Sequence, residues 1–160
     1  PHERAIWRLP QPLPSAPPPT PVRAQAEYET NDGLLIRWGS QNALLTEMTV
    51  AVTTLTTDAL MYIVVASTAQ QTSATGTLQA AGANMTRVRF VIAPTNSVWI
   101  RDYGPRYVDT GGARAIIDHV YNRPRPLDDA LPAAIAQQWN EARYEIPLTR
   151  HFYTYTPPRP

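Results

Sequence analysis

The chain has 160 residues, of which 14 are basic and 13 acidic, so its formal net charge is +1. This length fits one domain with a sizeable core, and the balanced charge, with no basic block, argues against nucleic acid or an anionic membrane as a partner. No apolar run is long enough to span a bilayer. Cysteine is absent, which excludes disulfides, thiolate metal sites and a cysteine nucleophile within these residues.

Residues 1–23 are expected to form an arm or linker because they are rich in proline. Such a stretch favours polyproline II and cannot enter the interior of a sheet. Binding to a proline-recognition module is a less favoured alternative, since few aromatic or basic residues accompany the prolines. The chain begins with Pro1 rather than Met, which fits removal of an upstream segment. A proline-rich spacer favours a secreted or envelope-attached protein over a cytoplasmic one.

The folded part is expected to begin near Ala24, with strands and helices in alternation. A continuous apolar, β-branched run over residues 60–66 is typical of a strand buried in a parallel sheet. Apolar residues between 41 and 56 repeat at helical spacing, which predicts a helix there. The other elements expected in this half are strands at 34–38 and 87–92 and a helix over 68–81 that stops at Gly82.

In the second half of the chain, strands are predicted at 99–102 and 113–120. Asp128 and Asp129 are expected to cap a helix over residues 130–141. The alternation of strands and helices along the whole chain indicates an α/β domain.

The stretch from Asn96 to Pro105 reads Asn-Ser-Val-Trp-Ile-Arg-Asp-Tyr-Gly-Pro and contains candidate binding groups. Trp99 offers a flat apolar face, and Asp102 offers two oxygens in one plane. Together they suit a planar cation such as guanidinium, which stacks on the ring and pairs with the carboxylate. The alternative is a buried tryptophan, a surface pair of Arg101 with Asp102, and a tight turn. Residue types alone favour this alternative, because short motifs have many false positives.

Several motifs taken together favour the guanidinium interpretation. Trp-Ile-Arg-Asp-Tyr-Gly-Pro at 99–105, Tyr-Asn-Arg-Pro-Arg-Pro at 121–126 and the following Asp128-Asp129 closely resemble bacterial peptidylarginine deiminases. These enzymes are relatives of agmatine deiminases in the guanidino-group-modifying, or pentein, superfamily. Residues 33–38 and 42–45 are also similar to the first strand and helix of the family. The resemblance implies a partial pentein, built from repeated ββαβ units around a pseudo-symmetry axis, although no repeat is detectable in the residues themselves.

The resemblance also implies a chemistry. A deiminase attacks the central carbon of a guanidinium with a strong nucleophile, usually a thiolate, and needs a histidine as acid and base and carboxylates to fix the nitrogens. Asp102 corresponds to one such catalytic carboxylate, and Trp99 lines the pocket, with no metal or organic cofactor. The family's cysteine, its histidine and a second carboxylate would lie after residue 160. His119 is interpreted as a residue on the sheet surface rather than as a base.

Arg123 and Arg125 form a candidate carboxylate clamp. Pro124 disfavours helix in the residue before it, so the two arginines lie in an extended segment, and two such guanidinium groups can hold a carboxylate. The resemblance implies that they receive the free carboxylate of a carboxy-terminal arginine, which agmatine lacks. The alternative is a solvent-facing loop whose arginines pair with Asp128 and Asp129.

We therefore interpret residues 24–148 as the amino-terminal portion of a deiminase that converts peptidyl-arginine to citrulline and ammonia when complete. Residues 149–160 form a divergent tail, because they do not resemble the Gly-Gly-Asn segment that follows in the family. One alternative is an agmatine deiminase-like hydrolase of small molecules; another is a non-catalytic interaction protein that uses residues 1–21 and 157–160. We also expect self-association or pairing with a complementary fragment, because a partial pentein leaves sheet edges open.

Overall fold

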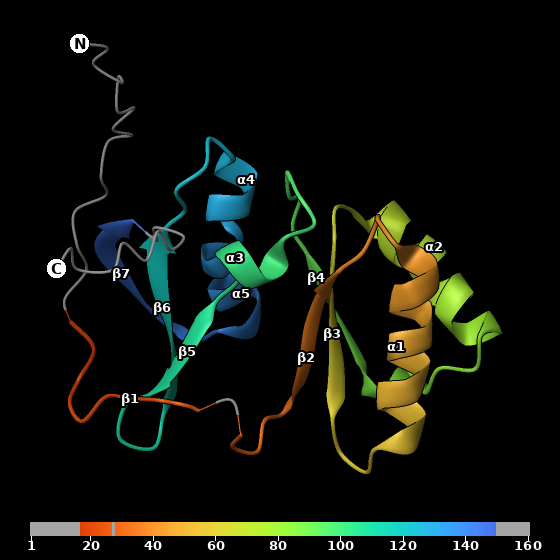
Figure 1. The fold of residues 1–160 in the computed structure, drawn as a ribbon, viewed down its shortest axis with the longest axis horizontal. Coiled ribbons are helices and arrows are strands. Elements are labelled where there is room, and N and C mark those ends of the chain that lie inside the picture. The colour runs from red at the N-terminus through yellow and green to blue at the C-terminus, as the bar shows by residue number, and fades with distance from the viewer. Residues whose placement is uncertain (1–16, 27, 150–160) are drawn as a thin grey trace, which may run out of the picture.

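The computed structural model describes residues 17–26 and 28–149 (Figure 1). These residues form two β-sheets with helices beside and between them, which confirms the predicted α/β class. No helix in the described ranges is long and apolar enough to cross a membrane. The elements in chain order are β1 (Arg23–Ala24), β2 (Gly33–Arg37), α1 (Asn42–Leu55), β3 (Leu60–Val65), α2 (Thr68–Ala80), the 3₁₀ helix η1 (Met85–Arg87), β4 (Val88–Ile92), α3 (Ile100–Tyr103), β5 (Arg106–Asp109), β6 (Arg114–Val120), α4 (Pro126–Asp129), α5 (Leu131–Trp139) and β7 (Ala142–Thr149).

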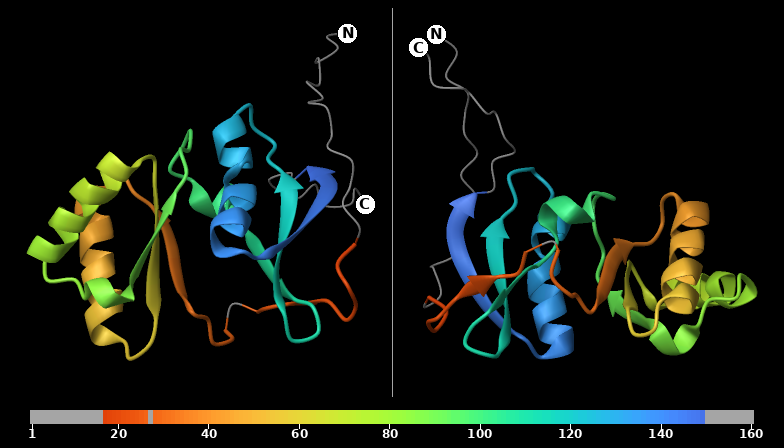
Figure 2. Two further views of the ribbon diagram at one scale, coloured as in Figure 1. Left: turned by 180° about the vertical axis from the view of Figure 1, so that it is seen from behind. Right: turned by 60° about the horizontal axis from the view of Figure 1, so that its bottom comes forward.

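The first sheet consists of three parallel strands in the order β2-β3-β4. Its middle strand β3 is the apolar run expected to be buried, and four of its six residues are buried. The β2–β3 pair begins where Gly33 faces Leu60, and a Cβ on Gly33 would lie 2.0 Å from the Leu60 carbonyl oxygen. Glycine at this position therefore allows the two strands to pair closely. Helices α1 and α2 cover the outer face of this sheet, as Figure 2 shows from two further sides.

The second sheet has the order β1-β5-β6-β7. Strands β5 and β6 form an antiparallel hairpin, and β6 is parallel to β7, which follows it after α5. This half of the chain is thus one ββαβ unit, the repeat that the resemblance implies. The short β1 pairs with β5, so Arg23 already belongs to a sheet. Most of the proline-rich arm, residues 1–16, and the tail from residue 150 lie outside the described residues.

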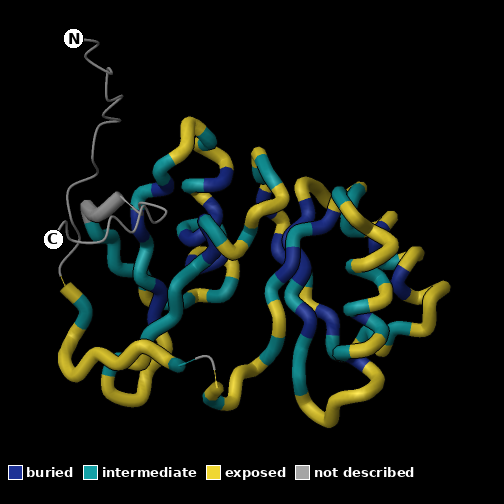
Figure 3. The backbone as a smooth tube through the Cα atoms, in the orientation of Figure 1, coloured by how far each residue is buried: buried dark blue, intermediate teal, exposed yellow. Residues whose placement is uncertain are grey.

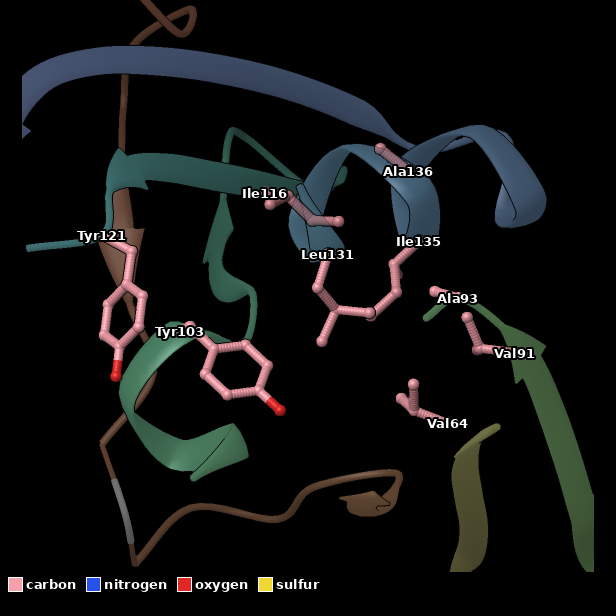
Figure 4. Packing of buried hydrophobic residues seen from close by; sticks show 9 residues of the cluster. All are labelled: Val64, Val91, Ala93, Tyr103, Ile116, Tyr121, Leu131, Ile135 and Ala136. Carbon is pink, nitrogen blue, oxygen red and sulfur yellow. The ribbon is translucent and has the colours of Figure 1, made fainter. Parts of the chain in front are cut away.

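Helix α5 lies between the two sheets and joins their cores. Leu131 and Ile135 on this helix are fully buried between Val91 of the first sheet and Ile116 of the second (Figure 4). The side-chain amide of Gln138 bonds both the N–H and the carbonyl of Ile92, each at 3.0 Å, so that α5 covers part of the outer edge of β4. Figure 3 shows the resulting buried residues concentrated in the strands on either side of this helix.

Two predicted elements differ from the structure. Residues 99–102 were expected as a strand, but residues 100–103 form the short helix α3, because the chain crosses here from one sheet to the other and turns to bury Tyr103. The helix expected over 130–141 is present as α5, but the acidic pair before it lies in an additional short helix, α4. Neither Asp128 nor Asp129 caps α5, whose start has no side-chain cap.

Candidate active site

The first candidate segment is the loop after β4 together with α3. Trp99 immediately precedes α3 and is 61% exposed, so the alternative of a buried tryptophan is wrong. Asp102 is half-buried in the same turn, and its backbone N–H donates to the Trp99 carbonyl at 2.8 Å. The indole and the carboxylate therefore belong to one short, locally hydrogen-bonded unit.

Tyr103 anchors this unit in the protein core. Its ring is buried beside that of Tyr121, with the ring centres 5.6 Å apart and the planes tilted by 59° (Figure 4). The Tyr103 hydroxyl donates to the Ser97 carbonyl oxygen at 2.6 Å. Burial raises the pKa of Tyr103 to about 12, so the hydroxyl remains protonated and available as a donor at neutral pH. The residue next to Asp102 thus ties α3 to the core below and to the loop before it.

Gly104 ends α3 at a position where a side chain does not fit. A Cβ on Gly104 would lie 2.6 Å from the Ile100 carbonyl oxygen, which accepts the Gly104 N–H at 2.7 Å. Gly104 is therefore a structural requirement of the turn that follows Asp102, and Pro105 then leads into β5.

The second candidate segment follows β6 and contains the two arginines. Arg123 is exposed and Arg125 half-buried, and the Arg125 N–H donates to the Arg123 carbonyl at 2.7 Å. Neither guanidinium forms an ion pair with any described residue, so the alternative in which they pair with Asp128 and Asp129 is wrong. Within residues 17–26 and 28–149, no carboxylate occupies either guanidinium.

The fold brings the two segments together, because α3 lies against α4. Asp128, at 0% exposure, accepts hydrogen bonds from the backbone N–H groups of Asn96 and Ser97 and from the Ser97 hydroxyl. Sequence reasoning considered Asp128 as part of the family motif, as a helix cap and as a possible partner of the arginines, and missed this role. The signal available in the sequence was the acidic pair immediately after the arginine motif.

His119 also belongs to this region, which corrects its assignment to the sheet surface. It is 9% exposed on β6, and its ring is hydrogen-bonded to the backbone of Asp102. Burial lowers the pKa of His119, which the Asp102 hydrogen bond and the nearby Asp129 charge partly oppose. A largely neutral imidazole thus supports the backbone of the candidate catalytic carboxylate, while its Nε2 has no hydrogen-bond partner among the described residues.

A separate cavity of about 160 Å³ lies near the starts of β2 and β6, away from the candidate site. Arg114 lines it, stacks 5.2 Å from the ring centre of Tyr107, and pairs with Asp32 and Glu141. None of the four predicted site residues lines this cavity, and its charged groups already satisfy one another. Within the described residues, no cluster of three or more potential metal-binding side chains is present.

The chain is similar to known deiminases in sequence and in fold. A family model for Porphyromonas-type peptidyl-arginine deiminases matches residues 23–149. An agmatine deiminase from C. jejuni matches with a TM-score of 0.62 at 16% identity, covering 81% of this chain and 40% of that one. A substrate-bound variant of C. jejuni agmatine deiminase matches with a TM-score of 0.62 at 15% identity, covering 79% of this chain and 40% of that one. A protein described as an arginine deiminase from Porphyromonas gingivalis matches with a TM-score of 0.63 at 12% identity, covering 78% and 40% respectively.

At such identities the solved structures show the fold alone, and they confirm that this α/β fold is that of the agmatine and arginine deiminases. The chain spans about 40% of the length of each of these structures.

Proposed function

Because the chain belongs to the Porphyromonas-type peptidyl-arginine deiminase family, we propose that it provides the substrate-binding portion of a hydrolase that converts peptidyl-arginine to citrulline and ammonia. Asp102 binds and polarises the substrate guanidinium, and Trp99 packs against its flat face. Arg123 and Arg125 hold the free carboxylate of a carboxy-terminal arginine.

The contact between α3 and α4 carries this proposal. It supports the proposal because α3 carries Asp102 and directly follows the exposed Trp99, while α4 directly follows the segment of Arg123 and Arg125. Neither arginine has an ion-pair partner among the described residues. A carboxy-terminal arginine has the complementary pattern, with a planar cation at the end of its side chain and an anion on its main chain. Agmatine has the cation only, so it would leave the arginine pair without a partner.

Binding without turnover is the expected behaviour of the 160-residue chain. Attack on a delocalised cation needs a strong nucleophile, and the sequence contains no cysteine to supply a thiolate. Ligand affinity is therefore the informative measurement for this chain, and a citrulline assay gives the complementary result, with no product above the enzyme-free blank.

Calorimetric titration with four ligands tests the proposal: a peptide ending in arginine, its carboxy-amidated form, its citrulline counterpart, and agmatine. Asp102→Asn should weaken each of the three guanidinium ligands by about 1.5–3 kcal/mol, because the charge-assisted contact is lost. Arg123→Ala and Arg125→Ala should weaken only the peptide with a free carboxylate. Asp58→Asn and Arg89→Ala are controls, because each removes a charge at an exposed position outside the two candidate segments. Neither control should change the affinity for any of the four ligands.

Two results would count against these roles. Equal weakening of the free and the amidated peptide by the arginine variants would make the segment structural rather than a clamp. Agmatine binding as tight as that of the free peptide, and insensitive to both arginine variants, would favour the alternative of an agmatine deiminase-like hydrolase.

A further inference from the structure

Four hydrogen bonds join the loop before α3 to the short helix α4. The Asp128 Oδ1 atom accepts from the backbone N–H groups of Asn96 and Ser97 at 2.7 and 3.1 Å, and its Oδ2 accepts from the Ser97 hydroxyl at 2.7 Å. In the opposite direction, the Leu127 N–H donates to the Asn96 side-chain oxygen at 2.9 Å. Asn96 and Ser97 are thus hydrogen-bonded to Leu127 and Asp128, and the two pairs are 31 positions apart in the sequence.

Backbone hydrogen bonds connect Asp128 to the segment of the two arginines. The Asp128 N–H donates to the Arg125 carbonyl at 3.1 Å, and the Arg125 N–H donates to the Arg123 carbonyl at 2.7 Å. The arginine segment is therefore fixed to the same residue whose carboxylate holds the loop.

Ser97, the partner of Asp128, is connected to Asp102. Ser97 lies two residues before Trp99, whose carbonyl accepts the Asp102 N–H at 2.8 Å. A short series of hydrogen bonds and peptide links thus runs from Arg123, through Asp128, to Asp102.

The loop has other anchors, which makes the part played by Asp128 specific. Arg37 Nε donates to the Thr95 hydroxyl oxygen at 2.9 Å, and the Tyr103 hydroxyl bonds the Ser97 carbonyl. These contacts hold the loop on β2 and α3 whether or not Asp128 is present. What Asp128 adds is the position of α4, and of the arginines before it, relative to that loop.

We propose that Asp128 is a positioning residue that sets the spacing between the guanidinium-binding Asp102 and the carboxylate-binding Arg123 and Arg125. It thereby selects the length of the substrate side chain. This inference rests on the proposed function. A buried carboxylate with three donors is a rigid connection, and a rigid connection between two half-sites favours a ligand whose cation and anion are separated by one particular number of methylene groups.

Peptides ending in arginine or in homoarginine, which is one methylene longer, provide the test when titrated into the full chain. The unmodified protein should prefer arginine by about tenfold or more, the usual effect of one misplaced methylene. Asp128→Asn keeps the shape but replaces one acceptor oxygen by a donor, and should reduce the preference to about threefold or less. Agmatine, which needs only the Asp102 half-site, should bind both proteins equally well.

Matched variants separate positioning from loss of folding. Ser97→Ala removes one of the four bonds and should give an intermediate preference, which keeps the test valid even if Asp128→Asn does not fold. Thr53→Val removes the hydroxyl of a buried side chain that accepts the Asn84 N–H near the other core, and this variant should keep the full preference for arginine.

The possible failures are distinguishable. If the unmodified protein does not distinguish free from amidated peptide, the proposed function fails and the inference fails with it. If it does distinguish them, but Asp128→Asn and Ser97→Ala retain the full preference for arginine, only the inference is overturned. A loss of preference in Thr53→Val equal to that in Asp128→Asn would also overturn it, because general destabilisation would then be the cause.

Discussion

The Tyr103 hydroxyl and the Ser97 carbonyl oxygen are 2.6 Å apart, and this hydrogen bond closes the loop that carries the exposed Trp99. The contact links a core aromatic ring to a backbone group that lies outside any helix or strand. It therefore determines how firmly α3 and Asp102 are held before a ligand binds.

Tyr103→Phe should destabilise the protein by about 1–3 kcal/mol, because the variant leaves a half-buried carbonyl without its partner. Urea unfolding followed by tryptophan fluorescence measures the change. The matched control is Tyr107→Phe, whose buried hydroxyl has no hydrogen-bond partner of standard geometry among the described residues. That variant should be close to neutral, and equal losses in the two proteins would contradict the importance of the Ser97 contact.

Gly104→Ala should also destabilise the protein, by about 1–3 kcal/mol, since the new Cβ would overlap the Ile100 carbonyl oxygen. Gly76→Ala is the control, because its Cβ meets nothing within 4 Å on the exposed side of α2. This control should gain about 0.5–1 kcal/mol from its better helix propensity. Denaturation midpoints that move in the same direction for both variants would show that the turn tolerates a side chain.

His119 should make stability depend on pH. Its pKa in the folded protein lies below the ordinary value of 6.5, so the unfolded chain binds more protons over the interval between the two values. The stabilisation from neutral His119 is therefore complete above 6.5 and is lost as the pH falls through that interval. Burial raises the pKa of Asp118, which acts in the opposite direction, since protonation at lower pH then favours the folded state.

Comparison with His119→Gln isolates the histidine, because Asp118 and the remaining histidines are present in both proteins. Urea midpoints at pH 7.5 and pH 5.5 should fall more on acidification for the unmodified protein than for the variant. Identical changes in the two proteins would show that His119 is not desolvated in the fold.

Self-association should be measurable by light scattering over a range of concentrations. Among the described strands, β2 pairs with β3 on one side only, and Leu34 on β2 is 39% exposed. An apolar, unpaired edge favours pairing with another chain, so Leu34→Lys should lower the average mass. Leu44→Lys, at a 54% exposed position on α1, should not. A monomeric mass at every concentration would show that the open edges are already protected.

The sequence by itself determined the elements that are long enough for their pattern of apolar residues to be recognised. The apolar run of β3 and the helical periodicity of α1 appeared close to their predicted positions, because burial on both faces, or along one helical stripe, leaves a clear pattern. The resemblance of the motifs to peptidylarginine deiminases identified Trp99, Asp102, Arg123 and Arg125 as candidates, and their individual roles stay predictions.

Only the tertiary structure decided the short and the long-range features. Helix α3 has four residues, too few to show a period, and the burial of Tyr103 determines its shape. An aspartate before a helix predicts a helix cap. Asp128 instead accepts hydrogen bonds from a loop 31 residues away, and such a long-range contact leaves no local pattern in the sequence. The alternation of residues along β6 gives the face of the sheet on which His119 lies. Only the position of α3 decides that His119 is buried there and that its ring contacts the backbone of Asp102.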